Sequence, residues 1–375
     1  MTGRDGTSKK SAGHQQQIAL WRIGSRAAAL TFFVWVFLLG GCGRQSYEPG
    51  DSVDAFSVHL DQRVPRLMNR YGVPGLSIAI VREGQLAWSG AYGYANLAQR
   101  RELTVEAIFR VGSISKSVTA WGVMRLVEQR LVGLDDPVQQ YLKSWELPVS
   151  EKDRREITVR RLLSNSAGMP LGILGQEYAP QHEMPSLRDY LLREVRLVIQ
   201  PGSGFIYSNV GFNLLELLVE EVSGQDFAAY MADEVLLPLG MHDSSFAWHD
   251  TIRTAMPSGY DLKGNTVPPY VYPVKAAGGL LAPVEDIARF VGAAMTGASF
   301  MDNGVLRRDS LRQLHTPQVN IPGLYGLVAD AYGFGHFIEW LPDGRRAVWH
   351  GGCLPFASVF SMKRALYLKA ANRRI

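Results

Sequence analysis

The sequence lacks the short motifs that mark several large classes of enzyme. It has no Gly-x-Ser-x-Gly elbow, which argues against an α/β-hydrolase. It has no His-Glu-x-x-His pair, and His242 and His249 have no zinc-binding company in the sequence. A glycine-rich phosphate loop is absent as well. We therefore expect no metal ion and no cofactor.

The sequence also lacks an excess of positive charge outside its first residues. The formal net charge is +4, but residues 1–41 carry five of the 39 basic residues and only one of the 35 acidic ones. The rest of the chain is close to neutral, so a nucleic-acid partner is not indicated. The hydrophobic content of 46% and the charged content of 20% are those of an ordinary globular protein.

Near the N-terminus, the apolar run is too short to cross a bilayer as a helix. Residues 27–39 are apolar except for Thr31 and follow two arginines, which is the pattern of a signal-peptide core. The run ends in Leu-Gly-Gly-Cys42 and resembles a bacterial lipoprotein signal, whose cysteine becomes the lipidated first residue. We expect an exported protein, lipid-anchored at the bacterial membrane and facing the periplasm or cell exterior. A plain secretory signal with a chance cysteine is the alternative.

Three segments follow from this pattern. We expect residues 1–42 to be the lipoprotein-type signal peptide, residues 43–55 a polar tether, and residues 56–375 the folded domain. The chain has only two cysteines, so lipidation of Cys42 would leave Cys353 alone. No intrachain disulfide is then expected.

Hydrophobic periodicity predicts strands at both ends of the domain and helices between them. Residues 75–81 and 86–92 predict a strand, a tight turn and a strand, and residues 331–341 and 347–352 predict two more strands. A helix is expected over residues 56–68, kinked or shortened by Pro65, and loop or short strand over residues 248–275. Further helices are expected around residues 114–127, 157–163, 187–195, 210–222 and 284–290.

This order predicts an α+β fold. An antiparallel sheet would take its halves from the two ends of the domain and be flanked by helices. The long helical middle would then form an inserted helical subdomain.

Ser113 and Lys116 form the only Ser-x-x-Lys pair in the chain. They stand at a predicted helix start, and a spacing of three residues puts both side chains on one helix face. A lysine amine in that place can take the serine proton if burial lowers its pKa. Taken alone, the pair would be read as a helix start with a solvated lysine.

Two weaker motifs lie downstream. Tyr207-Ser-Asn209 offers a phenol, which as phenolate beside an ammonium could act as a base, and an amide that could hold the lysine amine. Tyr94-Ala-Asn96 fits the same pattern but follows a predicted strand, and we interpret it as structural. His350-Gly-Gly352 is the only His-x-Gly, and its glycines would let substrate lie against a strand.

In this order and spacing, the three motifs resemble those of the serine β-lactamase and penicillin-recognising hydrolase family, over about residues 73–360. The similarity is to its class C β-lactamase, D-alanyl-D-alanine carboxypeptidase, esterase and D-aminopeptidase branches. It implies acyl transfer to Ser113 followed by hydrolysis, with Lys116 and Tyr207 sharing the proton transfers. Asn209 would orient substrate and amine, and the backbone N–H groups of Ser113 and Cys353 would form the oxyanion hole.

His350 departs from the family pattern. It stands where β-lactamases usually carry the lysine of Lys-Thr-Gly, and an unperturbed histidine is mostly neutral at pH 7. A neutral side chain binds a substrate carboxylate less firmly than lysine does. We therefore expect an esterase or peptidase acting on small ester, amide or D-amino-acid peptide substrates.

The C-terminal part departs from the pattern too. Only 25 residues follow His350, where the family supplies further strands and a helix. Residues 356–362 could form one strand, and residues 363–375 carry five basic residues and no acid, so we expect a truncated or frame-shifted ending. Two alternatives follow: a catalytically impaired protein that binds peptidoglycan peptides or penicillin, and a gene product that does not fold stably. The sequence leaves the oligomeric state open.

Overall fold

The computed structural model describes residues 52–173, 177–261, 263–295, 305–352 and 360–361. Its contacts separate residues 1–56 from a compact unit of residues 57–375. Everything below concerns this larger unit. Within the described residues, no helix is both long enough and apolar enough to span a membrane.

A β-hairpin begins the unit after helix α2 (Val53–Tyr71). Strands β1 (Gly75–Arg82) and β2 (Gln85–Asn96) pair antiparallel, and the short β3 (Arg101–Glu102) extends the sheet. The two turn residues, Glu83 and Gly84, both have positive φ, as the tight turns that suit strand twist require. Helix α9 (Val284–Ala294) packs on the hairpin. Helix α2 runs past Pro65 to Tyr71, so of the two predicted effects, a kink or a shortening, the shortening does not occur.

The C-terminal strands form a second antiparallel sheet. Its order is β11-β10-β9-β8, and β12 pairs separately with β13. Their bounds are Val319–Asn320 (β8), Ala331–Tyr332 (β9), Phe337–Trp340 (β10), Arg346–Trp349 (β11), Gly351–Gly352 (β12) and Phe360–Ser361 (β13). The combination of antiparallel strands and helices agrees with the prediction. Within the part of the chain that is described, however, the N-terminal and the C-terminal strands belong to separate sheets. Hydrophobic periodicity indicates which residues form strands but not which strands pair.

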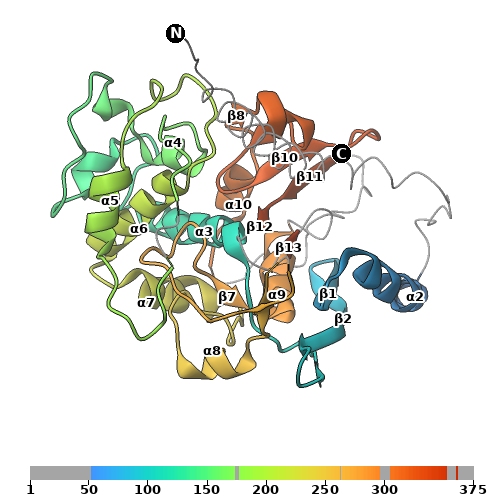
Figure 1. Cartoon of the computed structure of the whole chain (residues 1–375). Helices are drawn as coiled ribbons and strands as arrows, with labels where there is room; N and C mark the ends of the chain where they lie inside the picture. The colour runs from blue at the N-terminus through green and yellow to red at the C-terminus, as the bar shows by residue number, and fades with distance from the viewer. Residues whose placement is uncertain (1–51, 174–176, 262, 296–304, 353–359, 362–375) are drawn as a thin grey trace, which may run out of the picture. The chain divides into compact units, whose positions relative to one another are not determined.

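Helices fill the middle of the chain and hold most of the core. Figure 1 shows α3 (Ser115–Glu128) and α6 (Asn209–Ser223) side by side, and the two helices are in contact. Trp121 of α3 is fully buried against Phe290 of α9, with ring centroids 5.1 Å apart. The other helices are α4 (Val159–Leu163), α5 (Leu187–Glu194), α7 (Phe227–Met231), α8 (Asp250–Ala255) and α10 (Arg308–Leu314), with a π-helical turn, η4 (Ala232–Leu236).

Two small strand pairs complete the fold. Strand β4 (Phe109–Arg110) pairs with β7 (Leu281–Ala282), and β5 (Gly259–Tyr260) pairs with β6 (Thr266–Val267). Helix α8 lies where loop or short strand was predicted, so that prediction was wrong over residues 250–255. Its six residues are too few to give a readable helical period. Short 3₁₀ turns are η1 (Gly112–Ile114), η2 (Val138–Tyr141), η3 (Arg154–Glu156) and η5 (Gly323–Leu327).

Candidate active site

Ser113 lies in the 3₁₀ turn η1, between strand β4 and helix α3. Gly112 has φ +55°, a left-handed conformation that glycine adopts at little cost. The buried Ser115 hydroxyl donates to the Gly112 carbonyl (2.6 Å) and accepts from the Leu280 N–H (3.0 Å). These bonds fix the turn against the strand that follows Leu280, so the Ser113 hydroxyl is held in one place.

Lys116 is fully buried one turn later. Its Nζ lies 3.2 Å from Ser113 Oγ, 2.7 Å from Asn209 Oδ1 and 2.8 Å from the Ala277 carbonyl oxygen. Burial lowers the pKa of Lys116 well below its usual value, because the charged form loses its hydration. Burial thus favours the neutral amine, which is the form that could accept the Ser113 proton.

Tyr207 and Asn209 are positioned by the N-terminus of α6. Ser208 caps the helix: its Oγ accepts from the Gly211 N–H (2.9 Å) and donates to the Pro170 carbonyl (2.7 Å). The Ser208 N–H in turn donates to Asn165 Oδ1 (3.0 Å). The side chains on either side of this cap are thus tied to the loop after α4.

The Tyr207 phenol is buried, and burial raises its pKa well above the usual value for tyrosine. A hydrogen bond with Ser113 opposes that rise without cancelling it. The ring packs against both Tyr325 and Phe337, with centroid distances of 5.8 and 5.9 Å. Its face lies 4.9 Å from Lys116 Nζ. This environment disfavours the phenolate base suggested by the sequence and favours a neutral phenol.

His350 is buried beside the same phenol. Its Nε2 lies 3.2 Å from the Tyr332 hydroxyl and 3.4 Å from the Tyr207 hydroxyl, and its Nδ1 lies 2.7 Å from the Gly351 carbonyl. A carbonyl only accepts, so Nδ1 carries the proton and donates. Burial first, and then the Lys116 charge, lower the pKa of His350 well below its usual value. The structure therefore agrees with the expectation of a neutral imidazole.

Gly352 has a different reason to be glycine from the one that we predicted. A Cβ built on it would lie 2.0 Å from the Val111 carbonyl oxygen and 3.4 Å from Gly112 Cα. The missing side chain thus makes room for the turn that carries Ser113, a reason that the sequence did not show, because only the fold brings β12 against η1. The predicted role of Gly352 in substrate binding stays a prediction.

Replacing Gly352 with alanine should therefore displace the nucleophile turn. We expect a loss of stability of about 1–3 kcal/mol, as for other overpacked sites, and a slower reaction at Ser113. Gly351→Ala is the matched control, because a Cβ there meets nothing closer than the Trp349 ring at 3.9 Å. Thermal melts and serine-probe labelling rates would compare the two variants, and equal effects would contradict this explanation.

Several contributors to the site have no local signal in the sequence. Ala277 and Tyr332 come from segments far from the three motifs, and the carbonyl that Ala277 offers is present in every residue. Asn165 has φ +55° and holds Ser208, and the Ser-Asn-Ser-Ala-Gly composition around it indicated only a loop.

Asn96, from the second Tyr-x-Asn pattern, lies in β2 and donates to Ser258 Oγ (2.9 Å), which fits its structural interpretation. Cys42 and Cys353, the predicted lipidation and oxyanion-hole residues, lie outside the described residues.

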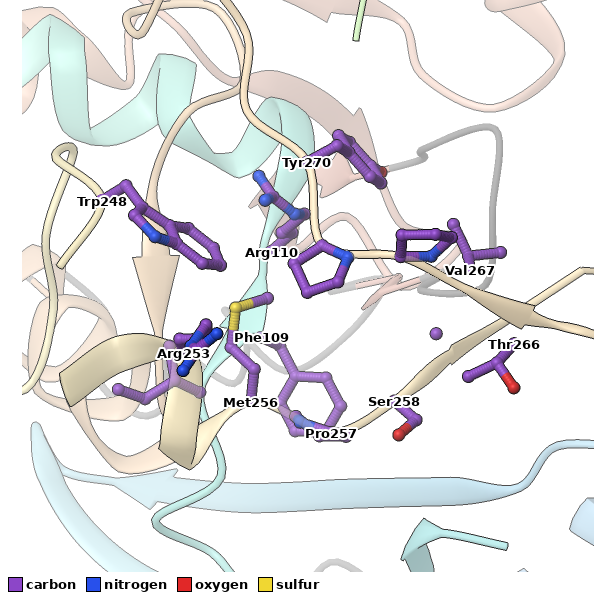
Figure 2. Close-up of a pocket in the computed structure, with 14 residues that line it drawn as sticks. Phe109, Arg110, Trp248, Arg253, Met256, Pro257, Ser258, Thr266, Val267 and Tyr270 are labelled. Carbon is purple, nitrogen blue, oxygen red and sulfur yellow. The ribbon is translucent and has the colours of Figure 1, made fainter. Parts of the chain in front are cut away.

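A cavity of about 440 Å³ lies beside strand β4. Figure 2 shows Arg110 between Trp248 and Tyr270, and its guanidinium carbon lies 4.3 Å from the centroid of the Tyr270 ring. None of the predicted site residues lines this cavity, whose walls come from β4, α8 and residues 256–270. The cavity is thus separate from the Ser113 site.

Two curated proteins are similar in sequence to this chain over most of its length. A human protein named putative β-lactamase-like 1 is 25% identical over 275 residues, which cover 71% of this chain and 54% of that protein. Penicillin-binding protein 4* of Bacillus subtilis is 24% identical over 330 residues, covering 81% and 68%. The chain thus spans about half the length of the human relative.

A solved structure is similar as well. The octameric penicillin-binding protein homologue from Pyrococcus abyssi superposes with a TM-score of 0.65 at 29% identity, covering 79% of this chain and 68% of that one. The family model described as Beta-lactamase matches residues 60–365, which is most of the chain. The chain therefore belongs to the Beta-lactamase family of serine hydrolases and penicillin-binding protein homologues.

Proposed function

We propose that the protein is a serine hydrolase that forms an acyl-enzyme on Ser113. The observation that carries the proposal is the buried Lys116 amine, 3.2 Å from Ser113 Oγ and with a lowered pKa. A serine hydroxyl needs such a neighbour before it becomes a useful nucleophile. An amine that stayed charged could not take its proton.

The proposed reaction has two halves. Neutral Lys116 takes the Ser113 proton as Oγ bonds to the substrate carbonyl carbon, and the backbone N–H groups of Ser113 and Cys353 stabilise the oxyanion. The proton then passes through the Tyr207 hydroxyl to the leaving alcohol or amine as the carbonyl–leaving-group bond breaks. Water repeats the sequence on the acyl-enzyme and releases the acid. Asn209 holds the amine in place throughout.

The surroundings of Tyr207 support small uncharged substrates. His350 is neutral and so offers a substrate carboxylate no positive charge. The turn η5 places Leu324, Tyr325 and Leu327 at the surface with 68%, 44% and 73% exposure, and Tyr325 stacks on Tyr207. An apolar rim of this kind suits the hydrocarbon part of an ester, amide or D-amino-acid peptide better than a charged group.

A matched pair of substrates tests this proposal. N-acetyl-D-alanyl-D-alanine carries a C-terminal carboxylate, and its methyl ester presents the same peptide without that charge. We expect kcat/KM for cleavage of the D-alanyl-D-alanine peptide bond to be at least about tenfold higher, or about 1.4 kcal/mol, for the methyl ester than for the free acid. We also expect hydrolysis of p-nitrophenyl butyrate. A folded protein that turns over none of these substrates would contradict the proposal.

Exchanging His350 for lysine should widen the substrate range. A buried ammonium in that place would attract a carboxylate that the neutral imidazole does not. We expect His350→Lys to gain measurable hydrolysis of a cephalosporin, which carries such a carboxylate, in a spectrophotometric assay. His350→Gln, which adds no charge, is the control. The absence of any gain in the lysine variant would count against our explanation of the substrate class.

We also propose export and lipidation at Cys42, which would hold the enzyme at the outer side of a bacterial membrane. The support for this is the sequence pattern of residues 27–42. The partners would be that membrane and a small-molecule or peptide substrate.

A further inference from the structure

One face of helix α6 lies toward the Lys116 amine and toward the segment of residues 275–277. Asn209, Asn213 and Glu216 are spaced by four and three residues, so they lie on the same helix face. Asn209 contacts the amine directly through its Oδ1 (2.7 Å). The other two residues do not touch the amine, although Glu216 is a fully buried acid that the proposed reaction leaves unused.

Glu216 binds the backbone of residues 275–277. Its Oε2 accepts from the N–H of Lys275 (2.7 Å) and from the N–H of Ala276 (2.8 Å). Asn213 Oδ1 accepts from the next N–H, that of Ala277 (3.2 Å). Three successive backbone donors are therefore held by two side chains of one helix.

This short segment supplies an acceptor to the proposed base. The Ala277 carbonyl oxygen lies 2.8 Å from Lys116 Nζ, and Thr119 of α3 donates to the neighbouring Ala276 carbonyl (2.9 Å). The position of the Ala277 carbonyl thus depends on α6 from one side and on α3 from the other. A change in its position would alter both where the amine lies and how readily it is protonated.

We propose that Glu216 is a positioning residue for the Ser113 reaction: by binding the Lys275 and Ala276 N–H groups, it fixes the Ala277 carbonyl that holds the Lys116 amine. This inference rests on the proposed function. Without Glu216, two N–H groups would lose their acceptor, and a buried donor left unpaired destabilises the fold by more than an ordinary hydrogen bond stabilises it. The segment would then move to find other partners.

Lys275 and Glu220 are the charged residues that act on Glu216. Lys275 Nζ lies 3.9 Å from Glu216 Oε1 and 3.2 Å from Asp226 Oδ2. Burial raises the pKa of Glu216 to about 7 against the opposing effects of Lys275 and the two N–H donors. The carbonyl oxygen of a protonated acid still accepts hydrogen bonds, and so does that of glutamine. Glu216→Gln therefore keeps the acceptor and removes the titration.

Three variants test the proposal: Glu216→Ala, Glu216→Gln and Leu217→Ala. Leu217 is buried in the core on the same helix, so its truncation destabilises α6 but keeps the side-chain acceptors of the Lys275, Ala276 and Ala277 N–H groups. The measured quantity is the rate of Ser113 labelling by a fluorophosphonate probe, followed by intact mass from pH 5 to 9. Thermal melts record the stability of each variant.

We expect Glu216→Ala to label about 10–100-fold more slowly than wild type at pH 7, and Glu216→Gln to stay within about threefold of wild type. The Ala277 carbonyl favours the charged amine, so its displacement lowers the pKa of Lys116 further. The acidic limb of the Glu216→Ala profile should then lie at lower pH than that of Glu216→Gln. Both variants lack the charge, so this difference isolates the hydrogen bonds.

The outcomes separate the two proposals. A wild-type protein that never labels would overturn the proposed function and this inference with it. A wild type that labels, with Glu216→Ala matching Leu217→Ala in both rate and pH limb, would overturn this inference alone. If Glu216→Ala does not fold, Asn213→Ala replaces it, with a smaller loss in the same direction expected; an unchanged rate and limb there would also overturn the inference.

Discussion

Replacing Ser113 with alanine is expected to abolish hydrolysis of small neutral esters. Alanine cannot form the acyl bond, and removal of a serine nucleophile from a comparable catalytic unit lowers kcat by about 10⁴–10⁶-fold. The side chain is small and the turn is held by Ser115, so the fold should be unaffected. Steady-state hydrolysis of p-nitrophenyl butyrate measures the effect.

The matched control is Ser203→Ala, which removes an exposed hydroxyl whose hydrogen bond is to the local Gln200 carbonyl. It should leave turnover at the wild-type level. Turnover that survives in Ser113→Ala at more than about a hundredth of the wild-type rate would mean that another group reacts with the ester, and the proposed mechanism would be wrong.

Replacing Lys116 with methionine is expected to slow acylation by about 10²–10⁴-fold, the usual contribution of a positioned base. Methionine has a similar length and suits a buried site, but it cannot accept a proton. The pH dependence should change as well. The pKa of Lys116 is lowered by burial, so the wild-type rate rises as pH increases through that lowered pKa and the amine loses its proton. This limb should disappear in Lys116→Met.

Stopped-flow measurement of acylation from pH 5 to 9 would test both effects. Lys143→Met, at an exposed position, is the control and should keep both the rate and the limb. A Lys116→Met variant that is folded and retains the wild-type pH limb would assign that limb to another group. The neutral Tyr207 phenol could not then be only a proton relay.

The parts of the site that depend on neighbouring residues were predictable from the sequence. Ser113 and Lys116 are one helical turn apart, so their contact follows from local geometry, and the structure places their side chains 3.2 Å apart. The helix after Asn209 follows from its apolar period and ends at Gly224, which has the left-handed φ expected of a helix end. The mixed helix-and-sheet fold likewise follows from the order of periodic segments.

The parts that depend on tertiary packing were not predictable. The Ala277 carbonyl reaches Lys116 across 161 residues of sequence, and a backbone oxygen has no residue type to signal it. The contact of Tyr332, in β9, with His350, which follows β11, depends on how the sheet packs, because β10 lies between those two strands. The close approach of Gly352 to the Val111 carbonyl was not predictable either, because nothing in a single sequence shows which backbone lies against a glycine. For the same reason, the sequence could not show which of the described strands pair with one another.

The protonation states of the ionisable groups were predictable only in part. The sequence indicated that a buried Lys116 could act as a base, but it could not show that the same burial keeps Tyr207 protonated. Desolvation acts on both groups and favours the neutral form of each, which raises the tyrosine pKa and lowers the lysine pKa. These opposite shifts support the proposed roles of the Lys116 amine as base and the Tyr207 phenol as proton donor.

The most direct test of the central claim is intact-mass labelling with a fluorophosphonate probe, followed by peptide mapping. We predict a single adduct on the wild-type protein, located on Ser113, and none on Ser113→Ala. An adduct on a different residue, or no adduct on a protein with a cooperative thermal melt, would contradict the claim that Ser113 is an activated nucleophile.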